Sequence, residues 1–238
     1  MTAGAHTTAA DLHQSDDKVT VVYHKLVGAY GVPEWRPDGD ALGGLIGTIL
    51  SQSTSDVNSD RAYRQLVAAF PSWEAVRDAP TDAVAAAIRS GGLANLKAAR
   101  IQQVLRALTE RIGGGPLTLD ALDTMDLDAA LAWLRELPGV GPKTAACVLL
   151  FSLGRPAFPV DTHVFRVARR IGLIGPRVNP EAAHGVLERA VPLEWRHTLH
   201  VNMIRHGRQV CHAQRPECER CVVRSWCDYY WQAVVLRG

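Results

Sequence analysis

Residues 137–144 read Leu-Pro-Gly-Val-Gly-Pro-Lys-Thr, and this stretch indicates a tight hairpin that leads into a helix. Gly139 and Gly141 allow the backbone to take positive φ angles and bring its N–H groups close to an anion. Pro142 presets the first helical turn, so Lys143 lies at the start of the helix. The pattern predicts a helix N-terminus that faces a phosphate. By residue type alone, Lys143 is either a phosphate-binding cation or a nucleophile.

An isolated carboxylate, Asp161, follows the helix that the hairpin begins. A helix over residues 143–153 carries the chain about 15 Å away from Lys143. The return segment 154–160 can span about 23 Å when extended, so Asp161 can come back to the lysine. Asp161 also directly precedes a predicted helix, where it can act as the N-cap. Its sequence position therefore allows a role as a cap, as a partner of Lys143, or as both.

Four cysteines near the C-terminus, Cys211, Cys218, Cys221 and Cys227, have the spacing C-x6-C-x2-C-x5-C. In a chain without a secretory signal, such a group indicates a metal site rather than two disulfides. Only one pair has the short spacing of a zinc knuckle, and four thiolates also suit a [4Fe–4S] cluster. The fifth cysteine, Cys147, lies alone in an apolar stretch and is expected in the core.

The chain has 238 residues, of which 47% are hydrophobic, enough for a sizeable core. Apolar residues recur at helical intervals, no useful strand alternation occurs, and no apolar run is long enough to span a membrane. The pattern therefore predicts an all-α protein. The predicted helices cover residues 19–30, 42–50, 57–70, 73–78, 82–88, 96–112, 127–136, 143–153, 162–171, 180–191 and 194–211.

Positive charge is unevenly distributed, although the net charge is only +2. Two groups of basic residues are nearly free of acids, and they predict either a basic face for a polyanion or solvated helix surfaces. The groups are Lys97, Arg100, Arg106 and Arg111, and Arg166, Arg169, Arg170 and Arg177.

Three segments together resemble the helix-hairpin-helix DNA glycosylases of the endonuclease III family: residues 137–143, residues 160–167 (Val-Asp-Thr-His-Val-Phe-Arg-Val) and residues 206–208 (His-Gly-Arg). The similarity extends from about Val19 to the C-terminal cysteines. It implies an all-α, two-lobed helix-hairpin-helix glycosylase fold with an iron–sulfur cluster loop. In that family the hairpin lysine forms a Schiff base, so the resemblance implies that Lys143 is the nucleophile and Asp161 its catalytic partner.

The resemblance also implies the cofactor and the domains. The cysteine spacing looks like the cluster loop of the family, which makes Cys211, Cys218, Cys221 and Cys227 ligands of a [4Fe–4S] cluster. Residues 43–153 are expected to form a six-helix barrel domain with the hairpin at 137–144. Residues 18–42 and 154–238 are expected to form a discontinuous cluster domain, with Lys143 and Asp161 facing each other across the cleft between the two.

The first seventeen residues are small, polar and acidic, which predicts a disordered tail over residues 1–17. The tail has neither the basic nor the apolar region of a secretory signal. A cytoplasmic protein, associated with the nucleoid when bound to DNA, is the expectation.

A glycosylase must flip its target base out of the duplex and fill the gap that remains. The resemblance implies that Leu93 is an intercalating wedge. Family members commonly carry a second, glutamine plug in the loop after the helix that ends at residues 49–51. Here Gln52 lies one place early and Ser53 occupies the glutamine position, so both are candidates. Ala94 replaces a larger side chain beside the wedge.

Backbone contacts to DNA are expected at two further places. The hairpin backbone at Gly139, Val140 and Gly141 is expected to bind a phosphate. Arg215 lies between the first two cysteines, and the family's cluster loop meets the DNA backbone, so Arg215 is the second candidate for phosphate contact.

The predicted function is a bifunctional DNA glycosylase and AP lyase in base excision repair. It removes oxidised or damaged pyrimidines through a lysine Schiff base and cleaves the abasic strand by β-elimination. Its expected partner is duplex DNA with damaged bases or abasic sites, and its expected state is a monomer. A thymine-mismatch glycosylase and a non-catalytic helix-hairpin-helix DNA-binding module are the alternatives.

Overall fold

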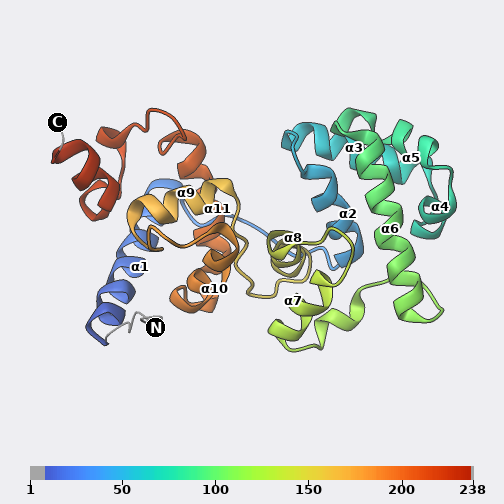
Figure 1. Ribbon diagram of the computed structural model, residues 1–238, viewed down its shortest axis with the longest axis horizontal. Coiled ribbons are helices and arrows are strands. Elements are labelled where there is room, and N and C mark those ends of the chain that lie inside the picture. Colours follow the sequence, from blue (N-terminus) through green and yellow to red (C-terminus); the bar gives the residue numbers. More distant parts are fainter. Residues whose placement is uncertain (1–8, 237–238) are drawn as a thin grey trace, which may run out of the picture. The chain divides into compact units, whose positions relative to one another are not determined.

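The computed structural model describes residues 9–236, in which helices are joined by loops and no strand occurs (Figure 1). The chain divides into two compact units, residues 36–157 and residues 1–35 together with 158–238. The predicted boundaries, 42/43 and 153/154, lie close to these divisions. We call the two parts the central unit and the terminal unit.

The central unit is built around a core of aliphatic side chains from several helices. Helix α2 contacts α3, α6 and α8, and α6 also packs beside α4 and α5, as Figure 1 shows. Ile46 and Ile49 of α2 and Ile101 and Leu105 of α6 are fully buried. The helices of this unit are α2 (Ala41–Ser51), α3 (Asp56–Ala69), α4 (Trp73–Asp78), α5 (Thr81–Ala87), α6 (Ala94–Ile112), α7 (Leu127–Arg135) and α8 (Pro142–Cys147).

The helix predicted over residues 143–153 changes its type after one and a half turns. It is α-helical over Pro142–Cys147 and continues as a π-helix over Val148–Ser152. The carbonyl of Ser152 accepts a hydrogen bond of 3.0 Å from the backbone N–H of Gly39, close to the start of α2. The hydrophobic pattern predicted a regular helix over this segment. It carries no information on a backbone hydrogen bond to a distant part of the chain such as the one between Gly39 and Ser152.

The terminal unit packs helices from both ends of the chain around a second core. Helix α11 contacts both α1 and α9, and Leu26, Phe158 and Met203 are fully buried. A Cβ atom on Gly207 would lie 3.0 Å from Cβ of His163, so a larger residue at this position would require α9 or α11 to shift slightly. The helices of this unit are α1 (Ala9–Tyr30), α9 (Thr162–Ile171), α10 (Pro180–Ala190) and α11 (Arg196–Gln209).

The start of α1 corrects the predicted disordered tail. Helix α1 begins at Ala9, so residues 9–17 are helical, and residues 1–8 lie outside the described residues. From Ala9 to Tyr23 the sequence has neither glycine nor proline, so the helix of residues 19–30 extends toward the N-terminus. Among the described residues, no helix is both long and apolar enough to cross a membrane.

Candidate active site

The hairpin of the central unit is anchored by two buried side chains and exposes the backbone between them. Leu137 and Val140 are buried in the core, and the N–H of Val140 donates a 3.1 Å hydrogen bond to the carbonyl of Leu137. Pro138 at the second position and Gly139, with φ +73°, at the third have the pattern of a type II turn. Gly141 has φ −90°, so only the first of the two glycines uses the predicted positive φ.

Helix α8 begins directly after this turn without a side-chain cap. Gly141 is its N-cap residue and Pro142 occupies its first turn, as the sequence predicted. Lys143 is half-buried in that turn, and its side chain makes no hydrogen bond or ion pair with the described residues of the central unit. The hairpin therefore presents both uncapped backbone N–H groups and an amine without a side-chain partner in its own unit.

Asp161 caps helix α9 in the terminal unit. Its Oδ1 atom accepts a 2.7 Å hydrogen bond from the backbone N–H of Val164, which confirms the predicted N-cap. The other carboxylate oxygen has no hydrogen bond to the described residues of the same unit. Lys143 and Asp161 belong to different units, so their pairing stays a prediction.

Backbone strain marks three of the predicted DNA contacts. In the described part of the chain, the residues other than glycine with positive φ are Ser53 (54°), Leu93 (49°) and Arg215 (50°). A left-handed conformation at such residues costs on the order of 1–3 kcal/mol and tends to occur at functional sites. All three residues are candidates from the sequence for filling the DNA gap or contacting phosphate.

The loops of Ser53 and Leu93 both lie in the central unit. Ser53 follows the end of α2 and Leu93 precedes the start of α6, and these two helices contact each other. Leu93 precedes α6, and its side chain is 57% exposed, as a wedge requires. Ser53 is exposed, whereas Gln52 is half-buried. Gly91 packs against α3, where an added Cβ atom would lie 3.0 Å from Cβ of Ala62.

The position of Lys97 corrects the prediction that it contributes to a basic face of the central unit. Its side chain is buried, and its Nζ atom donates to the carbonyls of Leu50 at 2.7 Å and Gly91 at 2.8 Å. Burial lowers the pKa of Lys97. A signal was present in the sequence, because Lys97 lies four residues before Ile101 and eight before Leu105, on the buried face of α6.

The four C-terminal cysteines line one small pocket in the terminal unit, and none of them forms a disulfide. Within the described residues, no three His, Cys, Asp or Glu side chains are placed to hold a single metal ion. In a [4Fe–4S] cluster each thiolate binds a different iron, so the ligands surround the cluster instead of meeting at one ion. Four free thiols around a shared pocket therefore fit this cofactor.

Burial controls the charge of this pocket. It raises the pKa values of Cys218 and Cys227, and it raises the pKa of Cys221 to about 11, with the neighbouring cysteines adding to the effect. Burial lowers the pKa of His206 to about 4, and its Nε2 atom lies 3.4 Å from Sγ of Cys221. A raised pKa favours the protonated thiol, so Cys218, Cys221 and Cys227 must release protons when they bind iron.

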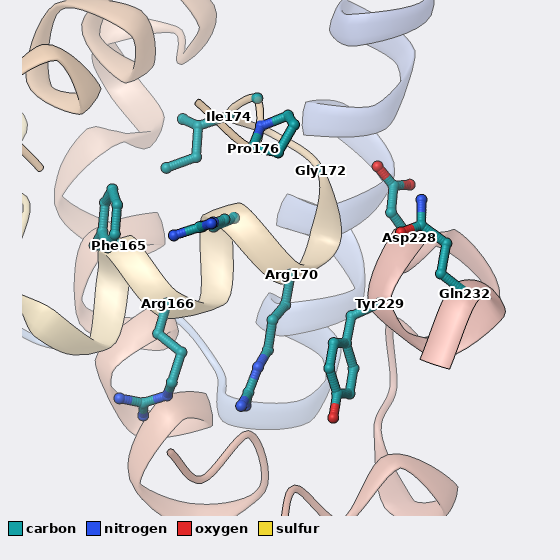
Figure 2. Close-up of a pocket in the computed structure, with 11 residues that line it drawn as sticks. Phe165, Arg166, Arg170, Gly172, Ile174, Pro176, Asp228, Tyr229 and Gln232 are labelled. Atoms are coloured by element: carbon teal, nitrogen blue, oxygen red, sulfur yellow. The ribbon is translucent and has the colours of Figure 1, made fainter. Parts of the chain in front are cut away.

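Two arginines of α9 hold the beginning of the cysteine loop. Arg166 donates from Nε to the carbonyl of Cys211 at 2.9 Å and from Nη2 to that of Gly207 at 2.8 Å. Arg170 donates to the carbonyls of His212 at 2.6 Å and Ala213 at 2.9 Å. Figure 2 shows both side chains leaving the same side of α9.

These contacts correct the predicted basic surface of the terminal unit as well. Figure 2 shows Arg170 beside Tyr229, and its guanidinium carbon lies 4.8 Å from the centre of that ring. Arg169, on the same helix, is exposed. Of these three arginines, two therefore stabilise the loop, and Arg169 remains the most open to a phosphate.

Two family models match the chain. Residues 46–192 match the model of the HhH-GPD superfamily of base excision DNA repair proteins. Residues 211–227 match the model of the iron–sulfur binding domain of endonuclease III. The first match includes the hairpin, Lys143 and Asp161, and the second begins and ends at the outer two of the four cysteines.

Relatives and a solved structure agree with these models. Endonuclease III of Thermotoga maritima is 32% identical over 198 residues, which cover 83% of this chain and 87% of the relative. Endonuclease III of Escherichia coli K12 is 34% identical over 185 residues, 78% of this chain and 82% of the relative. A non-covalent endonuclease III–DNA complex matches with a TM-score of 0.75 and 26% identity, over 90% of this chain and 96% of that chain.

Proposed function

Because this chain belongs to the HhH-GPD superfamily of base excision DNA repair proteins, and within it to the endonuclease III family, we propose that it is a bifunctional DNA glycosylase and AP lyase. Its substrates are oxidised or damaged pyrimidines and abasic sites in duplex DNA. It acts as a monomer on nucleoid DNA. The observation that carries the proposal is the amine of Lys143, which lies at the exposed hairpin without a side-chain partner in its own unit.

The other lysines are less suited to this reaction. The sequence holds four lysines, Lys18, Lys25, Lys97 and Lys143. Lys18 forms a 2.6 Å ion pair with Asp228, and Lys97 is buried against two carbonyls. Lys25 is exposed on α1, apart in sequence from the hairpin and from every predicted DNA contact. Lys143 is therefore the best placed nucleophile, and Lys25 is a suitable control.

The reaction begins when the damaged nucleotide leaves the base stack and its sugar reaches Lys143. Leu93, together with Gln52 or Ser53, fills the gap. The hairpin backbone at residues 139–141 and the side chain of Arg215 hold phosphates on either side of the target.

In the chemical step, Nζ of Lys143 attacks C1′ of the deoxyribose and the base departs with the electron pair of the glycosidic bond and a proton. The remaining amine proton moves to O4′ as the sugar ring opens, which gives an imine. Removal of a C2′ proton then forms a C2′–C3′ double bond and expels the 3′ phosphate with the electron pair of the C3′–O bond, which nicks the strand. Water finally hydrolyses the imine and frees Lys143. The free oxygen of Asp161 supports this sequence by stabilising the positive sugar and by carrying protons.

The cluster is assigned a structural task. Cys211, Cys218, Cys221 and Cys227 hold it, and when bound it supplies a covalent cross-link of the loop through four iron–sulfur bonds. The loop between the first two ligands then presents Arg215 from a fixed backbone. No step of the base excision reaction requires a change in the cluster.

Borohydride trapping tests the proposal. Purified protein is mixed with duplex DNA that carries an abasic site or an oxidised pyrimidine, and the imine is reduced to a stable amine. We expect a covalent adduct with wild type and with Lys25→Gln, and no adduct with Lys143→Gln. Binding of this DNA without any adduct would support the non-catalytic module instead. Faster release of thymine from mismatched duplexes than of oxidised pyrimidines would favour the alternative function of a thymine-mismatch glycosylase.

A further inference from the structure

The buried ammonium of Lys97 joins the two loops that are expected to fill the DNA gap. One acceptor, the carbonyl of Leu50, belongs to the last turn of α2, just before the loop of Gln52 and Ser53. The other, the carbonyl of Gly91, lies two residues before Leu93. We propose that Lys97 is a positioning residue that makes these two loops enter DNA as one rigid unit. This inference rests on the proposed function, because it assigns the gap-filling role to those loops.

The contacts around Gly91 show why a link at this point controls the position of Leu93. Gly91 packs closely on Ala62 of α3, and Oγ of Ser90 lies 2.8 Å from Oε1 of Gln65, also on α3. The loop before Leu93 is thus held against α3 by Ser90 and Gly91, and Lys97 joins it to the end of α2. The backbone of Leu93 follows directly, and its carbonyl accepts a 3.0 Å hydrogen bond from the N–H of Lys97.

Strain at both loops supports the same role. Ser53 lies three residues after Leu50, and Leu93 lies two residues after Gly91, and both have left-handed backbones. Such conformations persist only where the surrounding structure determines them strongly. A buried ammonium is costly to desolvate, and two carbonyl acceptors offset that cost by fixing the charge in place. The lowered pKa of Lys97 agrees with this desolvation.

Helix α6 contains a matched control for Lys97. Gln102 is also buried, and its Nε2 atom donates to the carbonyls of Val76 at 3.0 Å and Ala79 at 2.7 Å. These acceptors lie at the α4–α5 junction, which has no predicted contact with DNA. Gln102 also donates a longer hydrogen bond, of 3.4 Å, to the carbonyl of Arg77. Lys97→Met and Gln102→Met therefore each remove a buried side chain of α6 that donates to backbone carbonyls, but only the first concerns the gap-filling loops.

The test compares two abasic substrates by single-turnover cleavage. In one duplex the abasic site faces a base, and in the other it is bulged, with no opposite nucleotide, so that no gap has to be filled. We expect Lys97→Met to lower the ratio of the paired rate to the bulged rate by about tenfold, which corresponds to about 1.4 kcal/mol. Gln102→Met is expected to change both rates by the same factor, because it affects only the folded fraction.

Amide hydrogen exchange supplies a readout that does not depend on activity. Lys97→Met should raise exchange in residues 50–54 and 90–94 together, whereas Gln102→Met should raise it in residues 76–81. Should Lys97→Met fail to fold, Lys97→Gln, which can donate to at least one of the carbonyls, takes its place with a smaller change in the same direction.

The outcomes separate this inference from the proposed function. The inference would be overturned by equal ratios of paired to bulged rate for the Lys97 and Gln102 variants, or by faster amide exchange in only one of the two loops. The proposed function would still stand in that case, provided that the wild-type protein forms the trapped adduct. Absence of any trapped adduct with wild type would overturn the proposed function. In that case the exchange experiment still decides whether Lys97 joins the loops.

Discussion

The two units of this protein fix their functional loops by different means. In the central unit the hairpin and the two loops proposed to fill the DNA gap are anchored by buried residues of a continuous aliphatic core, among them Leu50, Leu137 and Val140. In the terminal unit the cysteine loop, residues 211–227, buries only Val223 and Cys227. The rest of the loop is held by arginine contacts to its backbone and, when the cluster is bound, would also be held by the four thiolate ligands. A packed core fixes loops by itself, whereas a loop with little core depends on a cross-link.

The largest expected effect concerns Lys143, the proposed nucleophile of the central unit. Lys143→Gln should lower strand cleavage by roughly 10³-fold or more, as loss of a covalent nucleophile typically does. The midpoint of thermal unfolding should stay close to that of wild type, because the side chain of Lys143 has no partner among the described residues of its unit. Cleavage kinetics and calorimetry on the same samples check both parts. A variant that is inactive because it is unfolded would contradict the view of a preformed hairpin.

The next effect concerns the cross-link of the terminal unit. Cys221→Ser should reduce the iron content and speed amide exchange throughout residues 211–227, because that loop lacks a core of its own. DNA affinity should fall by about tenfold through loss of ordered phosphate contacts, while exchange in the central unit stays unchanged. Cys147→Ala, which changes the cysteine outside the loop, should keep its iron. Faster amide exchange in the central unit of the Cys221→Ser variant would show that loss of the cluster also lowers the local stability of that unit.

Sequence patterns predicted the elements of the protein better than the links between them. Helical periodicity and caps located most helices, and the spacing of glycines and cysteines located the hairpin and the cluster loop. The carbonyl contacts of Lys97, Arg166 and Arg170 were missed because every residue has a backbone carbonyl, so such contacts leave no mark in the sequence. Helical spacing indicated only that Lys97 lies on the buried face of α6. The π-helix at Val148–Ser152 was missed for a similar reason, since hydrophobic spacing resembles that of an α-helix.

Variants of the α9 arginines measure how much of the stability of the cysteine loop is independent of the cluster. Arg166→Met removes charged hydrogen bonds to the carbonyls of Cys211 and Gly207 and should lower the stability of the loop by about 1–3 kcal/mol. Arg169→Met, at an exposed position on the same helix, should have little effect on stability. Hydrogen exchange of residues 207–217 in cluster-free protein measures the difference. Equal protection in both variants would leave the cluster as the main support of the loop.

The smallest expected effect tests whether the core of the central unit also depends on a polar contact. Burial and the nearby carboxylates of Asp40 and Asp38 raise the pKa of Tyr63 to about 12 from 10.0. A phenol whose pKa is raised by folding contributes stability that is complete below pH 10 and is lost as the pH rises through about 12. The central unit should therefore weaken over this range.

Tyr63→Phe isolates that contribution. Without the hydrogen bond to Asp40, the variant should be about 1 kcal/mol less stable than wild type near neutral pH. Its stability should fall less steeply above pH 10, because no phenol remains to ionise, so the two curves should approach each other. Urea unfolding across this pH range, followed by far-UV circular dichroism, checks the result. Parallel curves would mean that the N-terminal end of α2 is held by its aliphatic contacts and the Asp40 cap, without the phenol.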